Sequence, residues 1–152
     1  MFLIKVGYYG SMILYHGSRK KLDSLKAYQA TTVDDPKSLP EGELLYAIYL
    51  TPNFEFALAM GARPYGHIRI DNNEITFENP ELFDPNSDVY IYEFDDSEIE
   101  AQNLRRVDAK QYAVVGVEQL TPTNIQHLKS RELLKYYKLM NWQEQSGEMK
   151  RR

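Results

Sequence analysis

Short aromatic and β-branched runs, separated by clusters of Gly, Pro, Asn and Asp, are the feature that most constrains the fold of this chain. Strand-like runs occupy residues 12–16, 44–50, 89–94 and 112–117. Residues 67–70 and 74–77 flank Asp71-Asn72-Asn73, which predicts a hairpin. Because the predicted strands outnumber the predicted helices and do not alternate strictly with them, the pattern favours an α+β fold.

Two segments predict helices. Thr51 and Pro52 are residue types favoured at the N-cap and at the first helical position, and apolar residues follow them at helical spacing. Near the other end of the chain, Ile125 and Leu128 begin a second pattern of this kind. It predicts an amphipathic packing helix over residues 122–138.

At 152 residues the chain is long enough for one domain with a full core, and we expect residues 1–152 to form a single domain. Met12 stands directly before a predicted strand, so residues 1–11 are interpreted as an N-terminal extension. The polar residues 143–152 are expected to form a frayed tail. Residues 29–43 are rich in Pro, Gly and small polar residues and predict a loop that could act as a lid.

The composition excludes several classes of protein. The sequence has no cysteine, which excludes disulfides and a cysteine nucleophile, and its three histidines lack paired ligand spacing, so no metal site is expected. A formal net charge of −4 argues against a general nucleic-acid binder. No apolar run reaches the roughly 18–20 residues that span a bilayer. The apolar run at the beginning of the sequence is too short for the apolar region of a signal peptide. We therefore expect a cytoplasmic protein without membrane contact.

The most distinctive motif is Tyr15-His16-Gly17-Ser18, at the end of an early predicted strand. A second segment, Tyr46–Pro52, contains Tyr49 and leads into the first predicted helix. These segments resemble the first two active-site elements of the ADP-ribosyltransferase superfamily, in the branch of poly(ADP-ribose) polymerases and diphtheria-type toxins. The resemblance covers about residues 12–120. It implies a split, mostly antiparallel β-sheet with flanking helices and an NAD-sized cleft.

The resemblance implies that NAD is the substrate and assigns roles to the motif residues. Gly17, which lacks a Cβ, would offer its backbone N–H and C=O to the nicotinamide amide. His16 would hydrogen-bond the ribose hydroxyls, and Tyr49 would supply a stacking face for the ring. Ser18 completes the motif. Each residue also has a purely structural interpretation, because His-Gly-Ser occurs in many loops and a tyrosine in an apolar strand is usually part of the core.

The third element of that superfamily is normally a glutamate at the start of a later strand. Here Gln111, followed by Tyr112 and apolar residues, occupies that position. A glutamine can hydrogen-bond a ribose hydroxyl, but it has no charge to stabilise an oxocarbenium-like transition state. The loss of the glutamate's negative charge should therefore reduce the reaction rate more than the binding of NAD. Glu118 and Glu93 are the alternative carboxylates.

The helix after Tyr49 also departs from the superfamily pattern. A second aromatic residue that sandwiches nicotinamide often follows eleven positions after the tyrosine, and Met60 occupies that position. Methionine packs on an aromatic ring less rigidly. Tyr65 could serve instead if the helix ends near Gly61. Ala57 replaces a serine that is common in this helix.

Three functions remain open at this point. The leading hypothesis is an ADP-ribosyltransferase-like protein that binds NAD and transfers ADP-ribose to a macromolecule, with protein as a candidate acceptor. The alternative is a catalytically inactive NAD- or nucleotide-binding or protein-interaction domain on the same scaffold. An RNA 2′-phosphotransferase relative is a third hypothesis, but it requires clustered arginines. The arginines in question are scattered along the sequence, at Arg63, Arg69, Arg105 and Arg106.

Overall fold

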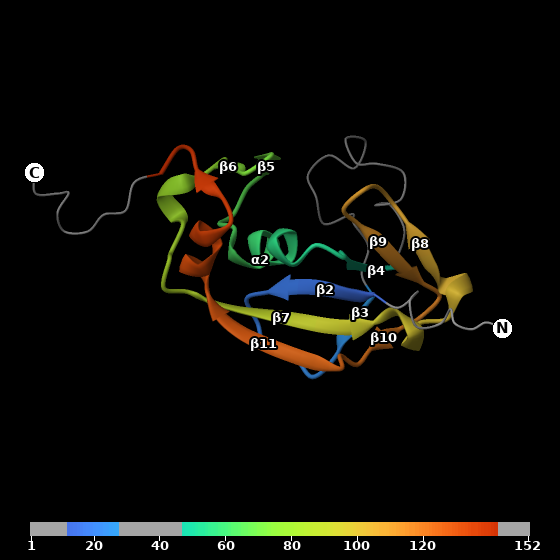
Figure 1. The fold of residues 1–152 in the computed structure, drawn as a ribbon. Coiled ribbons are helices and arrows are strands. Elements are labelled where there is room, and N and C mark those ends of the chain that lie inside the picture. Colours follow the sequence, from blue (N-terminus) through green and yellow to red (C-terminus); the bar gives the residue numbers. More distant parts are fainter. Residues whose placement is uncertain (1–11, 28–46, 143–152) are drawn as a thin grey trace, which may run out of the picture.

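The computed structural model describes residues 12–27 and 47–142, in which a three-stranded antiparallel sheet occupies the centre (Figure 1). This central sheet has the strand order β11-β7-β2. Its strands are β2 (Ile13–Ser18), β7 (Asp88–Asp95) and β11 (Asn124–Lys129). The predicted extension 1–11, the predicted loop 29–43 and the predicted tail 143–152 lie outside the described residues.

Three smaller sheets surround the central one. The antiparallel sheet β4-β9-β8 consists of β4 (Ala47–Leu50), β9 (Tyr112–Val115) and β8 (Leu104–Arg106). The sheet β12-β6-β5 consists of β12 (Lys138–Leu139), β6 (Glu74–Phe77) and β5 (Ile68–Asp71), and its β12–β6 pair is parallel. The last sheet pairs β3 (Leu25–Lys26) with β10 (Gln119–Leu120).

Helical structure is scarce among the described residues. The α-helix is α2 (Phe54–Ala62), and the rest are short 3₁₀ helices: η4 (Pro80–Leu82), η5 (Asp96–Glu98), η6 (Ala101–Asn103) and η7 (Ser130–Lys135). The described part is therefore a strand-rich, mostly antiparallel α+β arrangement, as the sequence predicted. The predicted hairpin is also confirmed: β5 and β6 pair antiparallel, and Asn72 in their turn has a φ of 58°.

The central sheet is buried on both faces. Alternate residues of β7 face opposite ways, so that Val89 and Ile91 join one apolar cluster and Tyr92 and Phe94 join another. We call the first cluster the α2 core; its other members include Ala57, Leu58, Phe77 and Leu133. We call the second the β4 core; its other members include Leu14, Ile48, Leu50 and Val114. The sheet therefore separates two cores.

Helix α2 lies across β2 and begins two residues later than the sequence predicted (Figure 1). Its N-cap is Asn53, whose Oδ1 accepts a hydrogen bond from the N–H of Phe56 at 2.7 Å. The prediction that Thr51 caps this helix is wrong, because Thr51 has a strand geometry and forms an isolated bridge with Tyr15. The bridge uses the backbone groups of Thr51 in a sheet contact, so the chain turns into the helix only afterwards.

The predicted final helix over residues 122–138 is also wrong. Residues 124–129 form β11 instead, and η7 follows it as a 3₁₀ helix. The reason lies in the two cores: Ile125 packs against the β4 core and Leu128 against the α2 core, on opposite faces of the strand. Apolar residues three apart are typical of a helix face, but a strand buried on both faces produces the same spacing.

Candidate functional site

The motif residues His16, Gly17 and Ser18 lie inside β2. Just before them, Tyr15 exchanges two backbone hydrogen bonds with Thr51, of 2.7 and 2.9 Å. In an antiparallel ladder every second residue presents its N–H and C=O to the same side. The backbone groups of Gly17 therefore point away from β7, as those of Tyr15 do, toward the side where β4 begins to diverge. We call this place the β2–β4 junction (Tyr15, His16, Gly17, Tyr49 and Thr51).

The register of the Tyr15–Thr51 bridge shows where Tyr49 lies relative to the motif residue Gly17. When this register is continued, position 49 stands opposite position 17, and residues opposed in this way place their side chains on one face. Tyr49 is 9% exposed and packs against Ala113, so most of its ring is covered by protein. The fold therefore brings Tyr49 and Gly17 to the same junction, where Tyr49 also contributes to packing.

His16 is tied directly to the same strand as Tyr49. Its Nδ1 lies 2.9 Å from the backbone oxygen of Tyr49, and since a carbonyl can only accept, Nδ1 is the protonated nitrogen. Burial lowers the pKa of His16 below its usual value of 6.5, and the hydrogen bond to Tyr49 opposes this shift only in part. His16 is therefore neutral near pH 7, with Nε2 as a hydrogen-bond acceptor.

Gln111 lies at the end of the turn that joins β8 to β9. The pairing of Leu50 with Tyr112 places position 111 opposite Thr51, and hence on the face of β4 that carries Tyr49. The backbone of Gln111 is fixed at both ends: its carbonyl accepts from the N–H of Val107 at 2.9 Å, and its N–H donates to Oδ1 of Asp108 at 2.9 Å. The third predicted element thus shares a face with the second.

Helix α2 and this turn are in contact through Phe56 of the helix and Lys110 of the turn, two residues that the sequence did not single out. The Nζ of Lys110 lies 5.6 Å from the centre of the Phe56 ring, a cation–π contact. Met60, half-buried, follows Phe56 by four positions and so lies on the same face of α2. No spacing rule marks Phe56 or Lys110, because their contact joins elements whose relative position only the tertiary fold determines.

Tyr65, the alternative to Met60, lies elsewhere. It follows the end of α2 and is 77% exposed, and its carbonyl accepts a hydrogen bond from Nδ2 of Asn79. The structure thus associates Met60, rather than Tyr65, with the helix face that turns toward Gln111.

Of the two alternative carboxylates, Glu93 lies beside the junction, because it is the cross-strand partner of Tyr15. Glu93 is paired with Tyr15 across the central sheet, one strand further from β4, and its carboxylate accepts from the side chain of Gln126. Glu118 is exposed and lies beyond the end of β9. Neither residue therefore occupies the position opposite Thr51 that Gln111 takes.

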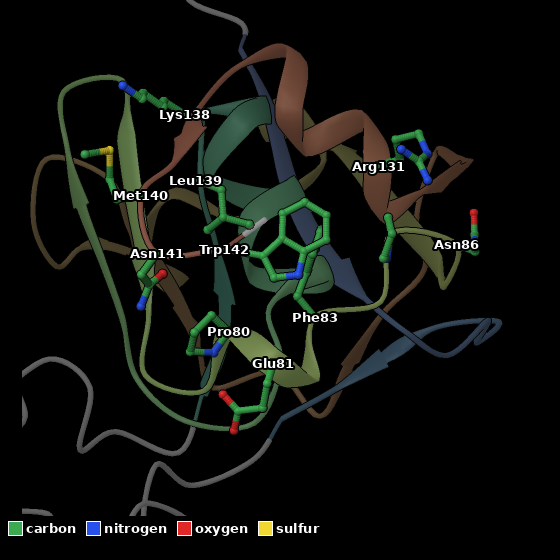
Figure 2. A pocket seen from close by; sticks show the side chains of 11 residues that line it. Pro80, Glu81, Phe83, Asn86, Arg131, Lys138, Leu139, Met140, Asn141 and Trp142 are labelled. Atoms are coloured by element: carbon green, nitrogen blue, oxygen red, sulfur yellow. The ribbon is translucent and has the colours of Figure 1, made fainter. Parts of the chain in front are cut away.

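A separate, open pocket of about 1060 Å³ lies at another part of the molecule (Figure 2). Figure 2 shows the indole of Trp142 in its middle beside Phe83, with Glu81 on one side and Arg131 on another. The rings of Trp142 and Phe83 meet edge to face at 5.1 Å. None of the predicted site residues lines this pocket.

Comparison with known proteins adds no assignment: no protein-family model matches the chain, and no curated protein or solved structure matches it either. The residues that the structure describes contain no cluster of three or more His, Asp or Glu that could hold a metal ion. In the same ranges, no helix is both long and apolar enough to cross a membrane.

Proposed function

We propose that this protein is ADP-ribosyltransferase-like and binds NAD at the β2–β4 junction, transferring ADP-ribose to a macromolecular acceptor. The observation that carries the proposal is the hydrogen bond from Nδ1 of His16 to the backbone of Tyr49. It joins the two motif residues at the point where β2 and β4 diverge. It also leaves Nε2 of a neutral histidine as an acceptor for a ribose hydroxyl.

The remaining groups of the junction suit the other parts of NAD. The outward-facing N–H and C=O of Gly17 are complementary to the C=O and NH₂ of a carboxamide, so they would hold the nicotinamide. Tyr49 lies opposite them in register. In this proposal the sheets β11-β7-β2 and β4-β9-β8 are the two halves of a split sheet. That arrangement is the one expected for the superfamily.

Gln111 favours a second candidate function, an NAD-binding module without catalysis. A glutamine on the Tyr49 face can orient a ribose hydroxyl but cannot offset the positive charge of an oxocarbenium-like transition state. The two candidates therefore share the binding site and differ in turnover. A gain of NAD hydrolysis in Gln111→Glu would favour the transferase. If neither wild type nor Gln111→Glu hydrolyses NAD, the binding module would be favoured.

NAD binding by calorimetry tests the shared part of the proposal. Wild type should bind NAD, and His16→Ala should bind at least about tenfold more weakly, because it loses a partly buried hydrogen-bonding group. His127→Ala is the matched control: His127 is an exposed histidine that stacks on Tyr90, away from the junction. Thermal melts of each variant separate loss of the site from loss of the fold. A wild type that does not bind NAD would exclude both candidates.

A further inference from the structure

The turn between β8 and β9 is organised around one exposed carboxylate. Oδ1 of Asp108 accepts hydrogen bonds from two successive backbone N–H groups, those of Lys110 at 2.7 Å and Gln111 at 2.9 Å. The turn is closed a second time by the N–H of Val107, which donates to the carbonyl of Gln111. An aspartate that bonds the backbone two and three residues later is a strong turn former. The backbone of Gln111 is therefore held in place by the turn.

The same turn is anchored to α2. Lys110, whose N–H donates to Asp108, places its Nζ over the ring of Phe56. Helix α2 in turn packs on β2 at Gly17, where the carbonyl of Ala57 leaves no room for a Cβ. A chain of contacts thus runs from Asp108 through the turn and α2 to the motif strand. The link between the turn and α2 is the side chain of Lys110, and the link between α2 and β2 is a backbone contact.

We propose that Asp108 is a positioning residue that presents Gln111 to a ligand at the β2–β4 junction, with Lys110 holding the turn against α2. This inference rests on the proposed function, because it takes NAD as the ligand. Asp108 acts through Gln111 and does not touch the ligand. Without its carboxylate, part of the binding free energy is spent on ordering the turn.

The test is a double-mutant cycle on NAD affinity. Asp108→Ala should raise the Kd for NAD about fivefold in the wild-type background and have no further effect in Gln111→Ala. Asp108→Asn keeps the Oδ1 acceptor and should restore most of the affinity. Asp84→Ala is the matched control, because Asp84 caps a turn remote from the junction by accepting from the N–H of Asn86. It should leave the Kd unchanged.

Two further measurements keep the outcomes distinct. Amide hydrogen exchange of Lys110 and Gln111 should accelerate in Asp108→Ala, which reports the turn whether or not NAD is present. If Asp108→Ala does not fold, Lys110→Met should still raise the Kd, by about twofold to threefold. Equal effects of Asp108→Ala with and without Gln111, or an unchanged Kd despite faster exchange, would overturn the positioning role alone. A wild type that does not bind NAD would overturn the proposed function as well.

Discussion

Gly17→Ala tests most directly how the motif strand is packed. A Cβ at this position would lie 1.9 Å from the carbonyl oxygen of Ala57 and 2.8 Å from its carbonyl carbon. Both atoms belong to the backbone of α2, so no side chain can rotate away, and the helix itself must move. Overpacking typically costs about 1–3 kcal/mol, and we expect the upper end of this range. In a protein of this size that corresponds to a fall in Tm of roughly 6–12 °C.

Urea unfolding followed by circular dichroism measures this loss. The control is Ser18→Ala in the next position, which removes a hydrogen bond from the N–H of Lys20 to the Ser18 hydroxyl and should cost less than about 1 kcal/mol. A Gly17→Ala protein within about 0.5 kcal/mol of wild type would refute the packing argument. The result also bears on binding studies: if the helix moves, lost NAD affinity in Gly17→Ala says little about the glycine backbone, and His16 is the better probe.

Two other predictions concern the face of the central sheet that is opposite α2. Because burial lowers the pKa of His16, the unfolded chain takes up a proton below about pH 6.5 that the folded protein resists. Wild type should therefore lose stability as the pH falls from 7 to 5, by at most about 1.4 kcal/mol per pH unit from this group. Urea unfolding of wild type and His16→Gln at each pH measures this contribution. If the free energies of unfolding of the two proteins change in parallel with pH, the pKa shift of His16 is contradicted. Tyr92→Phe should lower the free energy of unfolding by about 1–2 kcal/mol in the same assay. The reason is that the buried hydroxyl of Tyr92 donates to the carbonyl of Lys20 and accepts from the N–H of Leu22. A change near zero would show that water replaces these hydrogen bonds.

The strands were predictable where a single run of side chains records burial. Residues 89–94 are mostly β-branched or aromatic and predict β7, although its side chains serve both cores, and the apolar run that ends at Leu50 predicts β4. The helix predicted over residues 122–138 failed because its first apolar residues, Ile125 and Leu128, have helical spacing. Its apolar residues serve two cores, so their spacing reports two faces at once. A pattern read along one segment cannot tell how many surfaces cover that segment.

The candidate site was predictable in its residues but not in its geometry. The motif around His16 and the strand around Tyr49 could each be located from local sequence. Their relation depends on the Tyr15–Thr51 bridge, a register between distant segments that no local signal encodes. The role of Asp108 was missed for a related reason: an aspartate in a turn is common, and only the neighbouring Gln111 makes it of interest.

The position of β7 between β2 and β11 has a consequence for how the chain reaches its native state. Hydrogen bonds at this sheet join residues far apart in sequence, such as Met12 and Asp96, which are 84 positions apart. Closing loops of this length costs entropy before any core forms, so folding belongs on the millisecond-to-second scale. The β5–β6 hairpin can form within microseconds, but it contributes no strand to the central sheet. We therefore expect the pairing of β7 with β2, which contributes to both cores and to the candidate site, to form more slowly than this hairpin.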